Sequence, residues 1–231
     1  MDNETASIVI AIDGPAASGK SSTAHRVAER LGFRHIDSGA LYRAATAAAL
    51  QRGVDPATWT PESVLRDARS VSLVQGKRAF VPAIDGQQLD AEIRRADVTA
   101  NVSRVAQMQA VRDWVNAMVR AAAESRDVVV DGRDMGTAVF PDAALKVYLV
   151  ADPWERARRR LIQTIARSPT DEEIAAETDR LVKRDAADAT QSAAAKDAVL
   201  VDTTYVTQEE QVERIVALAA SAIQKRSRGS I

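Results

Sequence analysis

The chain has 231 residues, of which 46% are hydrophobic and 27% charged, and its 31 Lys and Arg nearly balance its 32 Asp and Glu. This composition is typical of a globular domain, and the lack of a net basic field argues against nucleic acid as a partner. The absence of cysteine excludes disulfides, iron–sulfur clusters and thiolate zinc sites.

The first predicted elements alternate between strand and helix. Residues 8–13 form an apolar, β-branched run that ends at Gly14 and predicts a buried parallel strand. We expect a helix from about residue 20 to Gly32, a strand over residues 33–37 and a helix over residues 39–52. Thr60 followed by Pro61 is typical of a helix start.

The middle of the chain changes character between residues 70 and 88. Short apolar pieces separated by Gly76 and by Asp85-Gly86 predict a small antiparallel sheet inserted between helices. Helical periodicity returns over residues 90–124. Strands are then predicted at residues 128–131, 145–150 and 198–202, with helix starts at Asp152 and Thr207 and a helix over residues 171–187. The alternation predicts the α/β class, with a parallel sheet covered by helices on both faces.

A glycine-rich segment follows the first predicted strand. Gly14-Pro15-Ala16-Ala17-Ser18-Gly19-Lys20-Ser21 fits the P-loop pattern G-x-x-x-x-G-K-[ST]. Glycines let backbone N–H groups wrap a phosphate, Lys20 can reach the β- and γ-phosphates, and the Ser21 hydroxyl can ligate Mg²⁺. The pattern predicts a nucleoside triphosphate site with Mg²⁺ as cofactor, but a P-loop alone does not distinguish a kinase from a GTPase or a motor. Its predicted contacts are Gly14, Ala16, Ala17, Ser18, Gly19, Lys20, Ser21 and Ser22.

A second polar segment follows the second strand. Ser38, Tyr42 and Arg43 could present hydroxyls and a guanidinium to another anion, since strand carboxyl ends face the ligand crevice of an α/β sheet. The same residues could instead cap a helix with Ser38 and pack its surface. The segment alone does not decide between these interpretations.

A third segment, residues 131–141, follows the strand over residues 128–131. Arg133 could donate to phosphate oxygens, while Asp134 could accept from an exocyclic amine such as cytosine N4. The alternative is a structural Arg–Asp pair in a loop.

Together these segments resemble the bacterial cytidylate kinases. The P-loop, the D-S-G-x-x-Y-R segment at residues 37–43, the D-G-R-D-x-G-T block from residue 131 and a late R-D-x-x-D stretch at residues 184–188 occur in the family's order. The resemblance covers nearly the whole chain. It implies a P-loop nucleoside monophosphate kinase fold over residues 1–231, with a monophosphate-binding insertion at residues 64–100 and a short lid at residues 158–171.

The resemblance also implies an activity and a set of roles. The activity is transfer of the γ-phosphoryl group of ATP to CMP or dCMP, by a cytoplasmic enzyme, expected to be a monomer, that needs no membrane partner. The residues implied to hold the CMP phosphate are Ser38, Tyr42, Arg43 and Arg133, those for the cytosine edge are Ser103, Arg112 and Asp134, and Asp188 is implied for the ribose. The residues expected to act in transfer are Lys20, Arg133, Arg159 and Arg184.

The chain departs from the family at its late motif. An Arg is expected three residues after Asp188, but Gln191 stands there, and the P-L pair that usually follows is missing. Because Gln lacks both the charge and the fork of Arg, we expect weaker discrimination between CMP and dCMP, unless Lys196 supplies a substitute cation.

Two other functions remain open on the residues alone. The chain could be a P-loop kinase for another acceptor, such as UMP, AMP or a small metabolite. It could also be a nucleotide-dependent switch that binds a triphosphate without transferring its phosphoryl group.

Overall fold

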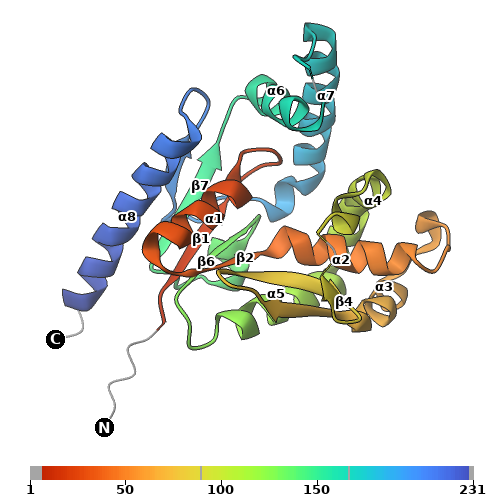
Figure 1. Ribbon diagram of the computed structural model, residues 1–231, viewed down its shortest axis with the longest axis horizontal. Coiled ribbons are helices and arrows are strands. Elements are labelled where there is room, and N and C mark those ends of the chain that lie inside the picture. The colour runs from red at the N-terminus through yellow and green to blue at the C-terminus, as the bar shows by residue number, and fades with distance from the viewer. Residues whose placement is uncertain (1–6, 89, 166, 229–231) are drawn as a thin grey trace.

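The computed structural model describes residues 7–88, 90–165 and 167–228. One mixed sheet forms its centre, in the strand order β3-β4-β2-β6-β1-β7-β8, with β5 paired to β4 (Figure 1). The strands are β1 (Val9–Asp13), β2 (Arg34–Asp37), β3 (Val71–Gln75), β4 (Ala79–Ile84), β5 (Gln87–Gln88), β6 (Val128–Gly132), β7 (Leu145–Val150) and β8 (Val199–Asp202).

Helices cover both faces of this sheet (Figure 1). The helices are α1 (Lys20–Leu31), α2 (Ser38–Leu50), α3 (Pro61–Asp67), α4 (Ala96–Ala106), α5 (Gln109–Ala123), α6 (Pro153–Thr164), α7 (Asp171–Asp188) and α8 (Gln208–Arg228). Shorter turns are η1 (Pro56–Thr58), η2 (Ala68–Ser70), η3 (Glu92–Arg94), η5 (Ala189–Gln191) and the π-helix η4 (Met135–Val139). None of the helices within the described ranges is long and apolar enough to cross a membrane.

Two hydrophobic clusters hold the layers together. On one face, Ile10 and Ile12 of β1 pack with residues of α1 and α8. On the other, Ala11 of the same strand packs with residues of α2 and α5. Successive side chains of a strand point to opposite faces, so a strand covered on both sides reads as a continuous apolar run. The parallel pairings of β1 with β6 and β7 confirm the predicted fold class.

The predicted helix ends are also confirmed. Thr60 caps α3 in a capping box with Ser63, and Asp152 caps α6 by accepting from the backbone of Trp154 and Glu155. Gly32 ends α1 with a φ of 73°, a left-handed conformation that glycine adopts without a steric penalty. These local signals fix where each helix starts or stops relative to the strand ends.

The antiparallel hairpin of residues 71–84 is less separate than we expected. β3 and β4 pair antiparallel, as predicted, but β4 also pairs in parallel with β2, through His35 with Ala79 and Ile36 with Phe80. The hairpin therefore continues the main sheet. A physical reason is that β2 would otherwise be an edge strand with unpaired backbone groups, and Phe80 buries its ring in the core over α2.

Candidate active site

Three strands end in acidic residues at the same edge of the sheet. Asp13 ends β1, Asp37 ends β2, and Asp131 lies in β6 between them, in register with Asp37. Parallel strands bring their carboxyl ends together, and in open α/β sheets this edge faces the ligand crevice. The glycine-rich loop and the two later polar segments all start at this edge.

The glycine-rich loop connects β1 to the start of α1. A side chain on Gly14 would place its Cβ 2.8 Å from the carbonyl oxygen of Leu149, so the strand end admits only glycine. Ser18 is fully buried, and its hydroxyl has no hydrogen-bond partner in the structure. Lys20 donates from Nζ to the carbonyl of Pro15 at 3.1 Å. The loop therefore forms a hollow that only glycine allows, at the N-terminus of a helix. Backbone N–H groups and the positive end of the helix make such a hollow suited to binding an anion.

Asp131 organises the entrance to α1. Its carboxylate accepts from the Ser21 hydroxyl at 2.5 Å, and its other oxygen lies 2.7 Å from Nε2 of His35. Burial lowers the pKa of His35, but the hydrogen bond to Asp131 and the negative charge of Asp131 outweigh burial. The pKa of His35 is therefore raised above its ordinary value. Burial together with neighbouring Asp131 raises the pKa of Asp37. His35 and Asp131 therefore hold Ser21 in one orientation.

Asp13 joins β1 to the π-helix η4. Its buried carboxylate accepts from the backbone N–H groups of Met135 and Gly136, at 2.9 and 2.8 Å. Burial raises its pKa to about 6, against the lowering effect of these two hydrogen bonds. The contact positions the segment that carries Arg133 and Asp134.

A central cavity lies in front of these strand ends. Its lining residues include Ala16, Ala17, Lys20 and Ser21 of the loop, with Ser38, Tyr42, Arg43, Ser103, Arg112, Arg133, Asp134, Arg160, Arg184, Asp188, Gln191 and Ser192. Most residues predicted from the sequence as site residues thus meet in one space, although they come from elements far apart in the chain.

One side of the central cavity carries several cations. Burial and neighbouring Arg133 lower the pKa of Lys20 to about 8 and that of Arg184 to about 10, and burial lowers the pKa of Arg43. Lowered pKa values of bases show positive charge gathered where little solvent screens it. This part of the cavity is therefore suited to anions.

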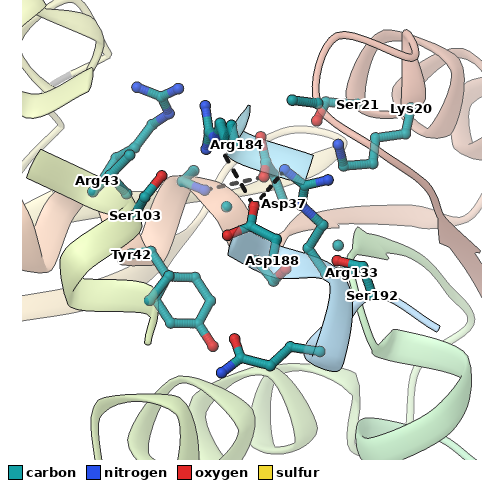
Figure 2. A pocket seen from close by; sticks show the side chains of 18 of the residues that line it. Lys20, Ser21, Asp37, Tyr42, Arg43, Ser103, Arg133, Arg184, Asp188 and Ser192 are labelled. Carbon is teal, nitrogen blue, oxygen red and sulfur yellow. Dashed lines mark hydrogen bonds and ion pairs between the residues drawn. The ribbon is translucent and has the colours of Figure 1, made fainter. Parts of the chain in front are cut away.

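Arg133 lies 3.8 Å from Asp185, but the main anionic partner of this cluster among the described residues is Asp188. Arg133 pairs with it at 3.0 Å and Arg184 approaches it at 3.9 Å, and Figure 2 shows the two guanidinium groups reaching Asp188 from two sides. Arg133 also donates to the carbonyl of Gly14 at 3.1 Å, so it links the glycine-rich loop to the second half of the cavity. Arg184 keeps a buried Nε without a hydrogen-bond partner.

The opposite end of the cavity contains a buried ion pair. Arg112 and Asp134, 8% and 5% exposed, bind each other directly. The Tyr42 hydroxyl beside them is buried without a partner, and burial raises the pKa of Tyr42. A charged donor and a charged acceptor side by side match a planar ligand edge that offers both an acceptor and a donor.

Five predicted residues do not line the central cavity: Gly14, Ser18, Gly19, Ser22 and Arg159. Arg159 donates to the carbonyls of Thr203 and Thr204 after β8, whereas its neighbour Arg160 lines the cavity and pairs with Glu177 at 2.9 Å. Consecutive helix residues point about 100° apart, so only one of the two can face the cavity. Ser22 turns toward α8 and donates to Gln208.

The late motif also differs from expectation. Lys196 is exposed and does not line the cavity, so it does not replace the missing cation. Gln191 does line it, and its amide oxygen accepts from Arg112 at 2.7 Å.

Sequence reasoning missed a brace behind the glycine-rich loop. Asp185 accepts from the backbone N–H of Ala16 at 3.1 Å, and Arg156 donates to the carbonyl of Ala16 at 2.8 Å and to Asp185 at 2.6 Å. Helices α6 and α7, which lie side by side beyond the sheet edge in Figure 1, are thereby attached to the loop. The adjacent Arg184-Asp185 pair was the signal available in the sequence.

Fold and site together define a P-loop phosphotransferase. The glycine-rich loop lies between β1 and α1, and a second cationic site faces the same cavity. A solved structure of an uncharacterized protein from Eubacterium ventriosum has the same fold, with a TM-score of 0.51 at 12% identity over 93% of this chain and 98% of that chain.

Sequence comparison identifies the family. The family model described as cytidylate kinase matches residues 10–221. The cytidylate kinase of Pelodictyon phaeoclathratiforme is 43% identical over 92% of this chain and 94% of its own length. That of Geobacillus kaustophilus is 44% identical over 94% of this chain and 98% of its own length. The chain belongs to the cytidylate kinase family.

Proposed function

We propose that this protein transfers the γ-phosphoryl group of ATP to CMP or dCMP, forming ADP and CDP or dCDP. The observation that carries the proposal is the central cavity, where the glycine-rich loop and the cationic cluster meet the buried Arg112–Asp134 pair. Family membership supports the same substrates.

The triphosphate site is the loop from Gly14 to Ser22. Backbone N–H groups of the loop and the positive end of α1 would hold the phosphates, with Lys20 reaching the β- and γ-phosphates. The buried Ser18 hydroxyl, which has no partner, is consistent with a ligand that supplies an acceptor there. The absence of a side chain on Gly14 and Gly19 leaves the room that a phosphate needs.

A magnesium ion fits the residues beside this loop. The portion of the chain that the structure describes has no group of three or more His, Asp or Glu placed to hold a metal, which suits an ion bound largely by substrate phosphates. The Ser21 hydroxyl, oriented by Asp131, would be the protein's oxygen ligand. When bound, Mg²⁺ supplies positive charge to the triphosphate oxygens.

The monophosphate site is the remainder of the cavity. Ser38, Arg43 and Arg133 would hold the CMP phosphate, and Asp188 would bind the ribose hydroxyls after releasing Arg133. Tyr42, expected from the family to hold the phosphate, has its hydroxyl beside the Arg112–Asp134 pair and would lie nearer the base. Ser103, Arg112 and Asp134 would read the base. Asp134 can accept from the cytosine amino group, and Arg112 can donate to the ring acceptors.

The protein's contribution to transfer is positioning and positive charge. Lys20, Arg160 and Arg184 would neutralise charge on the migrating phosphoryl group, while Arg43 and Arg133 align the acceptor phosphate in line with it. The attacking oxygen belongs to an ionised phosphate, so no general base is needed. Arg159, expected from the sequence to act here, faces the loop after β8, and Arg160 is the better placed residue.

Closure over the substrates would exclude water from the phosphoryl group. The segments expected to move are the lid at residues 158–171 and the insertion at residues 64–100. Residue 166 of the lid and residue 89 of the insertion lie outside the described residues. The ion pair between Arg160 and Glu177 must open if Arg160 is to reach the phosphoryl group. The cytoplasmic location and the monomeric state stay predictions.

A coupled assay of ADP formation with CMP, dCMP, UMP and AMP tests the proposal. We expect turnover with CMP and dCMP, little with UMP or AMP, and slow ADP release without acceptor. Lys20→Ala should lower turnover by orders of magnitude without unfolding the protein. Equal turnover of all four acceptors would favour another kinase activity, and triphosphate binding without any transfer would favour a nucleotide-dependent switch.

A further inference from the structure

Gln191 contacts the base end of the cavity. The turn η5 follows α7 and brings the Gln191 amide to Arg112, whose Nη1 donates to Oε1 at 2.7 Å. An Arg side chain has no acceptor, so the amide oxygen must be the atom that faces it. The position where the family's late motif carries an arginine is thus occupied here by a neutral acceptor.

The hydrogen bonds of Arg112 leave a defined set of donors. Its guanidinium carries five N–H bonds. Nη1 donates to Gln191 and, at 3.3 Å, to the carbonyl of Ala106, while Nη2 pairs with Asp134. The Nε–H and the second N–H of Nη2 have no partner among the described residues. Those two are the donors left for a ligand.

The same three side chains separate two spaces. Arg112, Asp134 and Gln191 line the central cavity and also an outer cleft, whose other lining residues are Gln109, Asp113, Asn116, Arg120, Thr137, Ala138, Thr190 and Ala193. The three side chains therefore lie between the central cavity and the outer cleft. Asp134 binds Nη2 of the Arg112 guanidinium, and Gln191 binds Nη1. Without Gln191, only the Ala106 carbonyl would restrain Nη1.

We propose that Gln191 is a positioning residue for base discrimination and that it acts by holding Arg112. A fixed Arg112 can offer its free N–H groups to cytosine, which has acceptors at N3 and O2. Uracil carries a hydrogen at N3, so the same donor would meet another donor. A cation at position 191 would repel Arg112 instead of holding it. The inference rests on the proposed function.

The test compares specificity constants for CMP, dCMP and UMP in wild type and variants. Gln191→Ala should lower the CMP-to-UMP ratio about tenfold, because the lost hydrogen bond is to a charged group. The change should fall on KM for CMP more than on kcat, since the base lies away from the transferred group. The ratio of CMP to dCMP should stay within about twofold.

Two further variants separate positioning from general damage. Gln191→Glu keeps an acceptor and should retain the discrimination against UMP. Thr190→Ala changes an exposed neighbour in the same turn and should behave as wild type. An unchanged CMP-to-UMP ratio in a folded Gln191→Ala protein would overturn this inference, and so would a fall confined to the CMP-to-dCMP ratio. A wild-type protein that does not prefer CMP over UMP would instead overturn the proposed function, and this inference with it.

Discussion

The affinity for ATP should fall steeply between pH 7 and pH 9, because Lys20 loses its proton in that range. Burial and neighbouring Arg133 lower its pKa from 10.5 to about 8. With that value, the side chain is about 90% protonated at pH 7 and about 10% at pH 9. If only the ammonium form binds the phosphates, the dissociation constant rises about tenfold over this interval. A lysine with its ordinary pKa would still be about 97% protonated at pH 9 and would give almost no change.

Calorimetric titration with ATP, without an acceptor, measures this effect directly. The second ionisation of a phosphate monoester lies near pH 6, so the ligand charge is nearly constant over the range. Arg184, with a pKa of about 10, also stays largely protonated. Binding at pH 8 should take up about half a proton, seen by comparing two buffers of different ionisation enthalpy. Lys20→Arg, always charged, should bind without this pH dependence. A flat affinity in wild type would refute the account of Lys20.

Three further predictions concern stability. Burial raises the pKa of Asp13 from 3.8 to about 6, so the stability that its protonation contributes is present below pH 4 and is lost as pH rises through 6. The free energy of unfolding should therefore fall by at most about 3 kcal/mol between pH 4 and pH 7. Asp13→Asn should reduce this fall, measured by urea unfolding at the two pH values. His35→Leu should cost about 1.5–3 kcal/mol by leaving one carboxylate oxygen of buried Asp131 without its hydrogen-bond partner. Exposed His25→Leu should cost little, and equal effects of the two substitutions in urea unfolding would contradict the role assigned to His35. Gly132→Ala places a Cβ 2.5 Å from the Ser38 hydroxyl, which should cost about 1–3 kcal/mol; an unchanged melting temperature would show that this strand end can relax.

The local sequence pattern was sufficient to predict the helices and strands and the glycine-rich loop between β1 and α1. The apolar run before Gly14, the capping residues Thr60 and Asp152, and Gly32 at the end of α1 all act over a few neighbouring residues. Hydrogen bonds of a helix end and the conformational freedom of glycine are local properties. Their outcome can therefore be predicted without knowing the rest of the fold.

The sequence could predict which site residues lie together only for residues at the ends of the parallel strands. Parallel strands bring Asp37 and Asp131 to one edge, and this follows from the alternation of strands and helices. The resemblance to a family supplied the roles of Ser103 and Asp188, which lie in helices whose distance from that edge no local pattern reveals. Both side chains line the central cavity.

Tertiary packing alone decided the partners of the charged side chains. Arg159 and Arg160 are adjacent and chemically identical, but only the docking of α6 against α7 and the loop after β8 determines which faces the cavity. Likewise, Gln191 meets Arg112, 79 positions earlier in the chain, because the turn after α7 folds back onto α5. Hydrogen bonds and ion pairs form at a few ångströms whatever the separation in sequence, so these choices become fixed only when the helices pack.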